Sequence, residues 1–325
     1  MQDPTRSGDL LADRRYAYAR GLRDEGDLEA AADLALQALE LAPGFAPALF
    51  LLGEVREAQH RAAPDAEEAG RLRGEAVTAY QAALALDPTD PLGAAVRLAA
   101  LGAAETGAAM SPAYVRRLFD DYAPRFERHL VEGLRYRAPE MIAAALRRAT
   151  GPHVGGFRVG AVLDLGCGTG LMARALAGAA ERIEGVDLSP GMLRQAARTG
   201  LYARLDEGDL VEHLRGRPAS AFDLVVAADV FVYLADLGPV FREAARVLRA
   251  NGPFAFTVQA HDGEGVALGE DGRYAHSEAY LREAAASAGL GVAVLEAVST
   301  RQDRGRDVPG LLAVLRRGRG HGGAG

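Results

Sequence analysis

The chain has 325 residues, 49% of them hydrophobic and 25% charged. At about 100–200 residues per domain, this length predicts two domains. One cysteine excludes an internal disulfide and disfavours a cysteine-built zinc site. No apolar run reaches the roughly 18–20 residues of a membrane span. The polar residues 1–4 do not resemble a secretory signal, so we expect a cytoplasmic protein.

The charge is uneven along the chain. The net charge is −7, and all 37 basic residues are arginine, so no lysine can form a Schiff base. Residues 1–110 carry 18 acidic and 10 basic side chains, whereas residues 111–325 carry 26 and 27. Because binding to phosphates needs a basic face, this distribution argues against nucleic acid as a partner.

The first third has the composition of a helical repeat domain. Residues 10–106 are rich in Ala, Leu, Glu and Arg, which favour helices. One stretch runs from Tyr16 to Pro43 and a similar one from Ala48 to Pro88, and each ends in a proline that stops a helix. Small residues recur at helical spacing and would let antiparallel helices approach closely: Ala19, Ala31, Ala35 and Ala38.

These two stretches resemble the tetratricopeptide repeat. Their closing prolines are 45 residues apart, more than the roughly 34 residues of that repeat, and we place the excess near residues 60–73. The resemblance implies a docking surface for a protein partner. A helical domain that only packs on its neighbour remains an equal alternative, because at least three repeats are usual in a free-standing array.

The rest of the chain alternates strands and helices. We expect strands at residues 161–165, 182–186, 203–205, 222–227, 254–258, 291–298 and 311–315, and helices at residues 171–177, 191–198, 236–249 and 277–288. This alternation predicts an α/β domain with a mostly parallel sheet and helices on both faces. The last two strands are joined by a loop too short for a crossover helix, so they should pair antiparallel.

A glycine-rich turn follows the first of these strands. Its residues are Gly166, Cys167, Gly168, Thr169 and Gly170. Glycines let the backbone bend sharply and let a ligand lie against it. Three carboxylates accompany the turn: Asp164 precedes it, Asp187 ends the next strand, where it can accept hydrogen bonds from ribose hydroxyls, and Asp209 follows the third strand, where it can meet an adenine amino group.

A dinucleotide site is the main alternative for this turn. It would need a longer glycine motif that holds a pyrophosphate. Asp164 would then lie close to a phosphate, which is electrostatically unfavourable. A cationic adenosyl ligand without phosphates suits these residues better.

The arrangement resembles the class I S-adenosylmethionine-dependent methyltransferases over residues 111–317. The glycine turn, Asp187 and the strand from Phe222 to Asp229 carry this resemblance. It implies a Rossmann-like sheet of seven strands in the order 3-2-1-4-5-7-6, with strand 7 antiparallel. It also implies S-adenosyl-L-methionine as cofactor and S-adenosyl-L-homocysteine as product. The seven histidines show no metal-ligand spacing, so we expect no metal.

The resemblance also implies roles for individual residues. The cofactor's methionine part would lie along the glycine turn and be oriented by Asp164, while Cys167 serves as a small side chain within the turn. The ribose would bind Asp187. Four residues would surround the adenine: Leu188, Met192, Asp209 and Leu210. Two residues would line the sulfonium end: Ala228 and Asp229.

The segment from Tyr114 to His129 resembles the lid of small-molecule methyltransferases, including the quinone-biosynthesis type. Tyr122 and Arg125 would reach the cofactor from this lid, Arg125 by pairing with the methionine carboxylate. Such a lid behind tetratricopeptide repeats resembles a bacterial group of repeat-containing methyltransferases. We therefore divide the chain into a repeat domain (residues 1–106), a linker (107–112), a methyltransferase domain (113–317, lid helices 113–149) and a disordered tail (318–325).

Candidate catalytic residues follow the fourth and fifth strands, whose ends face the ligand crevice of such a sheet. His276 and Tyr274 are candidates for substrate contact or proton acceptance, and Tyr233 for lining the acceptor pocket. Ser277 is expected to cap the next helix. We interpret Arg301 and Arg306 as solvated hairpin residues rather than as a clamp for an anionic substrate.

Three functions remain open. The leading hypothesis is methyl transfer to an O, N or C nucleophile of a small molecule. A protein methyltransferase whose substrate is recruited by the repeats is less favoured, because Asp229-Val-Phe-Val stands where amide-methylating enzymes carry an Asn/Asp-Pro-Pro-Tyr/Phe motif. The third hypothesis is a non-catalytic adenosyl-binding scaffold.

Overall fold

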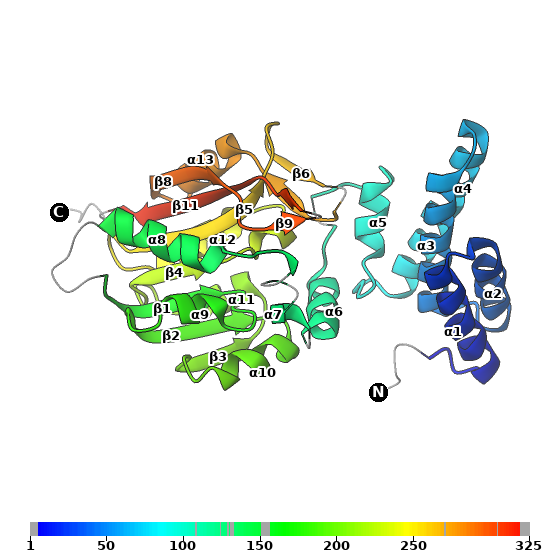
Figure 1. Ribbon diagram of the computed structural model, residues 1–325, viewed down its shortest axis with the longest axis horizontal. Coiled ribbons are helices and arrows are strands. Elements are labelled where there is room, and N and C mark those ends of the chain that lie inside the picture. The colour runs from blue at the N-terminus through cyan, green and yellow to red at the C-terminus, as the bar shows by residue number, and fades with distance from the viewer. Residues whose placement is uncertain are drawn as a thin grey trace. The chain divides into compact units, whose positions relative to one another are not determined.

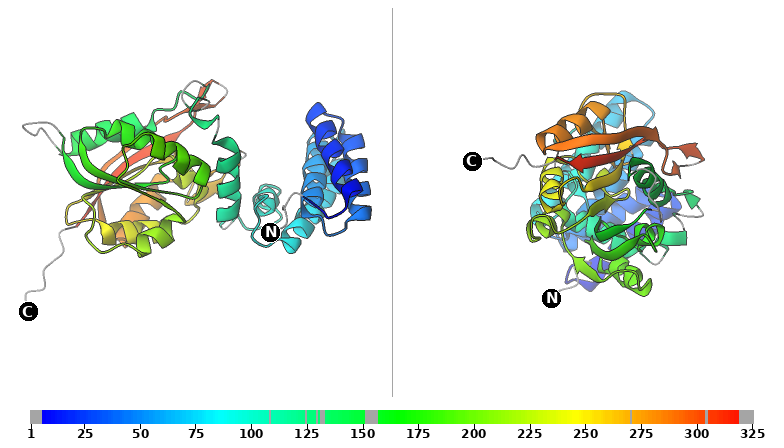
Figure 2. Two further views of the ribbon diagram at one scale, coloured as in Figure 1. Left: turned by 90° about the horizontal axis from the view of Figure 1, so that it is seen from below. Right: turned by 90° about the vertical axis from the view of Figure 1, so that its left-hand side faces the viewer.

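The structure, a computed structural model, describes residues 6–107, 109–123, 125–128, 130, 133–150, 157–269, 271–303 and 305–318. The chain forms two compact units, Met1–Tyr114 and Val115–Gly325. Figures 1 and 2 show a helical unit in blue to cyan and an α/β unit in green to red. The expected disordered tail lies outside the described residues from position 319 onward.

The helical unit consists of two antiparallel helix pairs and a short fifth helix. Its helices are α1 (Leu10–Glu25), α2 (Leu28–Leu41), α3 (Ala46–Ala62), α4 (Ala66–Leu86) and α5 (Ala94–Ala100). Each helix packs against the next one along the chain. In the part of the chain that the structure describes, no helix is both long and apolar enough to cross a bilayer.

Small residues hold these helices close together. The four alanines expected at helix contacts, from Ala19 to Ala38, are fully buried. In α3, a Cβ on Gly53 would lie 2.6 Å from the ring of Tyr80 in α4, so that helix pair needs glycine at this position. The expected close packing is therefore confirmed, while membership of the tetratricopeptide family stays a prediction.

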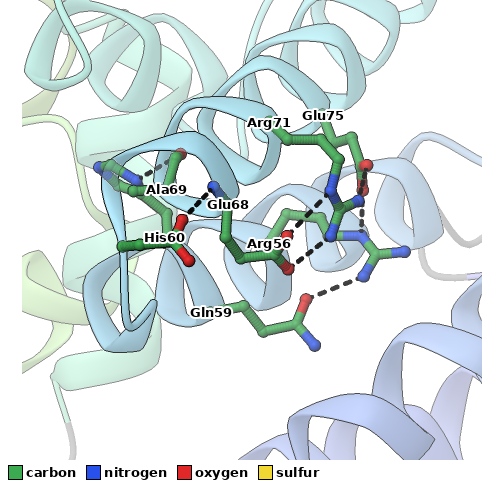
Figure 3. A network of polar contacts seen from close by, with 8 residues as sticks. Arg56, Gln59, His60, Glu68, Ala69, Arg71 and Glu75 are labelled. Atoms are coloured by element: carbon green, nitrogen blue, oxygen red, sulfur yellow. Dashed lines mark hydrogen bonds and ion pairs between the residues drawn. The ribbon is translucent and has the colours of Figure 1, made fainter.

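The excess residues near positions 60–73 lengthen the α3–α4 pair. Figure 3 shows the polar contacts in this region: Arg56 Nε of α3 lies 2.8 Å from Glu75 of α4, and within α4 Arg71 pairs with both Glu68 and Glu75. His60 Nδ1 lies 2.8 Å from the carbonyl oxygen of Ala69. The insertion therefore continues both helices instead of forming a loop.

The α/β unit is built on a sheet with seven strands in the order β3-β2-β1-β4-β5-β11-β8. Strand β11 pairs antiparallel with both β5 and β8, and the other pairs along this order are parallel. The predicted methyltransferase order and its antiparallel strand are confirmed. The strands are β1 (Val159–Leu165), β2 (Ala180–Asp187), β3 (Arg204–Glu207), β4 (Leu224–Ala227), β5 (Pro253–Ala260), β8 (Leu290–Val298) and β11 (Gly310–Arg317).

Helices cover both faces of this sheet, because its strands are apolar on both sides. In β4, Leu224 and Val226 pack with α8 (Ala138–Thr150) and α9 (Leu171–Ala175), while Val225 and Ala227 point to the opposite face. That opposite face is covered by α11 (Leu210–Arg215), α12 (Gly238–Val247) and α13 (Glu278–Ser287). The remaining helices are α6 (Pro112–Tyr122), α7 (Phe126–Arg128), α10 (Pro190–Arg198) and the 3-10 helix η2 (Phe231–Tyr233).

Four short strands were not among the strands expected from the sequence. Strands β6 (Val266–Leu268) and β7 (Tyr274–His276) pair with each other, and β7 also extends the sheet beside the end of β5. Strands β9 (Gln302–Asp303) and β10 (Arg306–Asp307) form the second hairpin. Runs of two or three residues are too short for a periodic pattern to reveal.

Candidate active site

The glycine turn lies where the two central strands end side by side. In the parallel β1–β2 pair, Asp164 lies opposite Gly185, so the turn after β1 adjoins Asp187 at the end of β2. Gly166, Gly168 and Gly170 have φ values of 64°, 53° and 91°, a region that favours glycine. A Cβ on Gly166 would collide with Val230. The backbone of this turn therefore requires glycine by conformation and by space.

Asp187 connects the glycine turn with the start of α10. One oxygen accepts a hydrogen bond of 2.9 Å from the amide of Gly168, and the other accepts one of 2.9 Å from the amide of Ser189. Burial raises the pKa of Asp187, although these amide donors oppose the shift. Each carboxylate oxygen has a further lone pair, so Asp187 can hold the turn and still accept from ribose hydroxyls.

Asp164 is a buried carboxylate with one oxygen lacking a partner. The hydroxyl of Tyr202 donates a 2.6 Å hydrogen bond to its Oδ2, while Oδ1 has no hydrogen-bond partner in the described chain. The side chain is 1% exposed. Burial raises the pKa of Asp164 to about 7, with a further contribution from the nearby Asp187. A buried acceptor without a partner fits a cationic ligand group such as the ammonium of S-adenosylmethionine.

Tyr202 is a site residue that the sequence analysis missed. It lies two residues before β3 and contacts Asp164, and a Cβ on Gly185 would lie 2.8 Å from its ring. The position of Tyr202 in the sequence does not indicate its contact with Asp164, because that contact depends on the side-by-side packing of β1, β2 and β3.

The other predicted cofactor contacts differ in their surroundings. Met192 is fully buried in α10, and Cys167 is 5% exposed, with a thiol whose pKa is raised by burial. Leu188 and Ala228 are partly exposed at the ends of β2 and β4. Their contacts with the cofactor stay predictions.

Asp209 and Leu210 have structural contacts besides their predicted place at the adenine. One oxygen of Asp209 accepts hydrogen bonds from the amides of Val211 and Glu212, at 2.9 and 3.1 Å, and so caps α11. Leu210 is 6% exposed and packs in the core. Their roles toward adenine stay predictions.

Asp229 is held by a buried arginine. Nη1 of Arg301 donates to both carboxylate oxygens of Asp229, at 3.1 and 2.9 Å, and Nη2 donates to Gln259 at 2.8 Å. The amide of Asp229 donates to Thr257 Oγ1 at 3.0 Å. Asp229 has a φ of 57°, so this bonded network fixes an uncommon backbone conformation at the end of β4.

The interpretation of Arg301 as a solvated hairpin residue is wrong. Its side chain is 5% exposed because β8 and β11 carry it over the end of β5 to Asp229. Arg306 is exposed in β10, as expected. A loop arginine next to a hairpin looks solvated in the sequence, since nothing local marks a carboxylate 72 residues away.

The predicted lid lies against the turn. Asp120 of α6 accepts hydrogen bonds from Ser189 Oγ at 2.6 Å and from the amide of Gly191 at 3.0 Å. A Cβ on Gly168 would lie 4.0 Å from the ring of Phe126. Tyr122 packs edge-on against Phe126, with ring centroids 5.3 Å apart.

Tyr233 and Arg125 complete the lid region. Phe119 of α6 packs edge-on against Tyr233, with ring centroids 5.2 Å apart, which joins the lid to the end of β4. Arg125 is exposed, and its pairing with a cofactor carboxylate stays a prediction. His129 lies outside the described residues.

His276 is a packed residue of β7. It is fully buried, and its Nε2 lies 3.0 and 3.2 Å from the carbonyl oxygens of Leu234 and Ala235. Its Nδ1 has no partner within the described chain. Burial lowers the pKa of His276 to about 4, so the ring is neutral at pH 7 and donates from Nε2. Tyr274 beside it is 2% exposed.

His276→Ala is expected to lower methyl transfer while leaving cofactor affinity unchanged. The imidazole holds the segment after η2, which carries Tyr233, and does not contact the glycine turn. A ring with a pKa about 4 also predicts that turnover has no step between pH 6 and 8 due to this histidine. Turnover and S-adenosylhomocysteine affinity of both proteins, measured from pH 5.5 to 8.5, check this. Wild-type turnover in the variant would remove His276 from the site.

The described residues include no group of three or more His, Cys, Asp or Glu side chains that could hold a metal ion. At the carboxyl edge of the sheet, the structure brings together Asp164, Asp187, Asp229, Tyr233 and Arg301.

Comparison with known proteins points to one family. Residues 163–256 match the family model described as a methyltransferase domain. Methyltransferase-like protein 27 of Homo sapiens is 39% identical over 110 residues, which cover 33% of this chain and 43% of that protein. A malonyl-[acyl-carrier protein] O-methyltransferase of Legionella pneumophila is 40% identical over 106 residues, 31% of this chain and 37% of that protein. The chain thus spans less than half the length of these curated relatives.

One solved structure is similar to this chain at low sequence identity. It is the Burkholderia thailandensis 1,6-didemethyltoxoflavin-N1-methyltransferase with bound 1,6-didemethyltoxoflavin and S-adenosylhomocysteine. It is 20% identical, covers 62% of this chain and 87% of that chain, and has a TM-score of 0.49.

Proposed function

We propose that this chain, which contains a class I S-adenosylmethionine-dependent methyltransferase domain, transfers the methyl group of S-adenosylmethionine to a nucleophile of a small molecule. One observation carries the proposal: the unpartnered, buried Oδ1 of Asp164 stands beside a turn of three left-handed glycines that Asp187 holds in place. This set offers an acceptor for an ammonium, a close backbone surface and an acceptor for ribose hydroxyls.

S-adenosylmethionine, when bound, supplies a methyl carbon already activated by the attached sulfonium. The nucleophile's lone pair forms the new bond to carbon as the carbon–sulfur bond breaks toward sulfur, and any proton on the nucleophile passes to solvent or a nearby base. The chain's residues mainly bind, orient and exclude water. Asp164 would hold the ammonium of the ligand and Asp187 its ribose, and the aromatic residues Phe119, Tyr122 and Phe126 would cover the turn from the lid.

The lid favours a small acceptor over a polypeptide. Phe119 of the lid packs against Tyr233, so aromatic rings lie between the glycine turn and the end of β4 and leave less room for a polypeptide. The second candidate is a protein methyltransferase that uses the helical unit for recruitment, and the third is a scaffold that binds the adenosyl ligand without catalysis. The two curated relatives' names do not decide among these, because the match covers less than half of each.

The first test measures cofactor binding and then transfer. Isothermal titration with S-adenosylmethionine and S-adenosylhomocysteine should give saturable binding of both. Labelled methyl transfer should then appear with a metabolite extract passed through a filter that removes macromolecules. Label found only in a protein fraction would favour the protein methyltransferase, and binding without transfer to either fraction would favour the scaffold.

Asp187→Ala is expected to weaken cofactor binding by about 1–3 kcal/mol, because hydrogen bonds to a charged group are lost. The Gly168 amide also loses its acceptor, which loosens the turn. Calorimetric titration with S-adenosylhomocysteine checks this against Asp303→Ala, which removes an exposed carboxylate from β9. Equal affinities in all three proteins would contradict the ribose assignment.

A further inference from the structure

Arg273 is a partly buried cation whose guanidinium lies over the ring of Tyr233 and forms no ion pair with a described residue. It lies directly before β7, at the same edge of the sheet as Asp229. Its guanidinium donates no hydrogen bond to the described residues, and none of their carboxylates lies within 4.0 Å of it. The more buried Arg301 and Arg217 differ, since each pairs with two acids. Arg273 therefore presents its N–H donors to whatever occupies this edge of the sheet.

A row of aromatic rings connects Arg273 with the glycine turn. The guanidinium carbon of Arg273 lies 5.9 Å from the ring centre of Tyr233. Tyr233 contacts Phe119, whose ring centre is 5.9 Å from that of Phe126 beside Gly168. A ligand that lies along this row has an apolar body and one end next to a guanidinium.

The charges around Arg273 limit the anion it can accept. Asp229 is already bonded to Arg301, and Asp271 lies 3.8 Å from Arg301 with 38% of its side chain exposed. Burial lowers the pKa of Arg273, but Tyr233, Asp229 and Asp271 outweigh burial and raise it. The charges of the two arginines thus balance those of the two aspartates. The positive charge of the cofactor's sulfonium would then be balanced by a ligand that carries one negative charge. A phosphate dianion would place more negative charge near both aspartates.

Building on the proposed function, we propose that Arg273 binds a carboxylate of the methyl acceptor. The acceptor is then a small carboxylic acid with an aromatic or other apolar body that lies along Tyr233 and Phe119. A guanidinium binds a carboxylate through two parallel hydrogen bonds and so fixes its orientation. Because the rings of Tyr233, Phe119 and Phe126 lie between Arg273 and the glycine turn, the group that receives the methyl is a different one on the same molecule.

The test compares acids with neutral molecules of the same shape. Benzoate and hexanoate, with benzamide and hexanamide as their neutral counterparts, are titrated into protein saturated with S-adenosylhomocysteine and followed by ligand-observed NMR. Wild type should bind at least one acid at least tenfold more tightly than its amide. Arg273→Gln should lose at least tenfold in affinity for that acid, and Arg273→Lys should lose less. Arg282→Gln, which removes an exposed arginine of α13, should bind as wild type does.

The readouts separate this inference from the proposed function. Titration with S-adenosylhomocysteine alone tests the cofactor site, and its affinity should be the same in wild type and Arg273→Gln. If the cofactor product binds but neither acid is preferred over its amide, or if Arg273→Gln keeps that preference, the role of Arg273 is overturned. If the cofactor product does not bind at all, the proposed function fails, and the inference fails with it.

Discussion

Asp164→Asn is expected to weaken S-adenosylhomocysteine binding roughly 10–100-fold at pH 8, because a bond to a charged group is worth about 1.5–3 kcal/mol. The substitution keeps an acceptor for the Tyr202 hydroxyl but removes the charge that, in the proposed function, binds the ligand's ammonium. With a pKa about 7, the wild-type carboxyl is mostly protonated at pH 6 and mostly charged at pH 8. Wild-type affinity should therefore rise about tenfold over this interval, and the variant's affinity should stay level.

The same substitution is expected to stabilise the cofactor-free protein at pH 8. The folded-state pKa of Asp164 lies above the unfolded value of 3.8, so the folded state binds more protons and wild-type stability falls as pH rises from about 4 to about 7. That shift corresponds to a cost on the order of 4 kcal/mol above pH 7. Burial of the polar asparagine amide offsets part of the stability gained by removing this charge. The variant's unfolding free energy should therefore exceed that of wild type by about 1–3 kcal/mol at pH 8, and the difference should vanish near pH 4.

Asp223→Asn is a matched control for both measurements. Asp223 also lies next to the sheet, but Arg249 and the amide of Ala161 outweigh burial and lower its pKa. This variant should lose stability at pH 8 and bind S-adenosylhomocysteine as wild type does. Thermal unfolding at pH 5 and pH 8 and calorimetric titration give the two readouts. Unchanged affinity in Asp164→Asn would show that Asp164 does not bind the ligand's ammonium. Lower stability of this variant at pH 8 would show that the buried charge does not destabilise the wild-type protein.

Local patterns predicted the alternation of strands and helices and the antiparallel last pair, whereas the strand order was implied by the resemblance to class I methyltransferases. Strands such as β4 are continuous apolar runs that must be buried on both faces, and the glycine turn after β1 marks the central crossover. The short loop between β8 and β11 fixes their antiparallel pairing. By contrast, β7 consists of three residues whose pairing depends on the end of β5, so its residues appeared to form a loop.

The sequence placed the carboxylates near the glycine turn, but it did not place the side chains that gather near Tyr233 and Asp229. Asp164 and Asp187 lie at fixed distances from glycines in one motif, so their meeting follows from the β1–β2 pairing. Tyr202, Arg273 and Arg301 reach the site from three separate loops, and no spacing links them to the residues they approach. His276 shows the converse: it follows the right strand, but the fold buries it between backbone carbonyls.

Arg301→Met is expected to cost about 3–5 kcal/mol in unfolding free energy, because it leaves a buried carboxylate without its partner. Burial already raises the pKa of Asp229 against the opposing effect of Arg301, so loss of the guanidinium forces this group to bind a proton or stay charged in an apolar site. For a unit of about 200 residues, this is a fall in Tm of roughly 6–20 °C.

The partner substitution separates the ion pair from simple packing. Asp229→Asn alone leaves the buried guanidinium of Arg301 without its carboxylate and should also destabilise the protein. Arg301→Met combined with Asp229→Asn should recover most of the lost stability, because both charges are gone. Asparagine tolerates the left-handed φ of 57° at this position, so the backbone is preserved. The control is Arg249→Met, whose ion pair with Asp223 is half exposed and should be worth less than about 1 kcal/mol. Thermal and denaturant unfolding of the four variants measure the coupling, and additive losses in the double variant would show that the two side chains stabilise the protein independently.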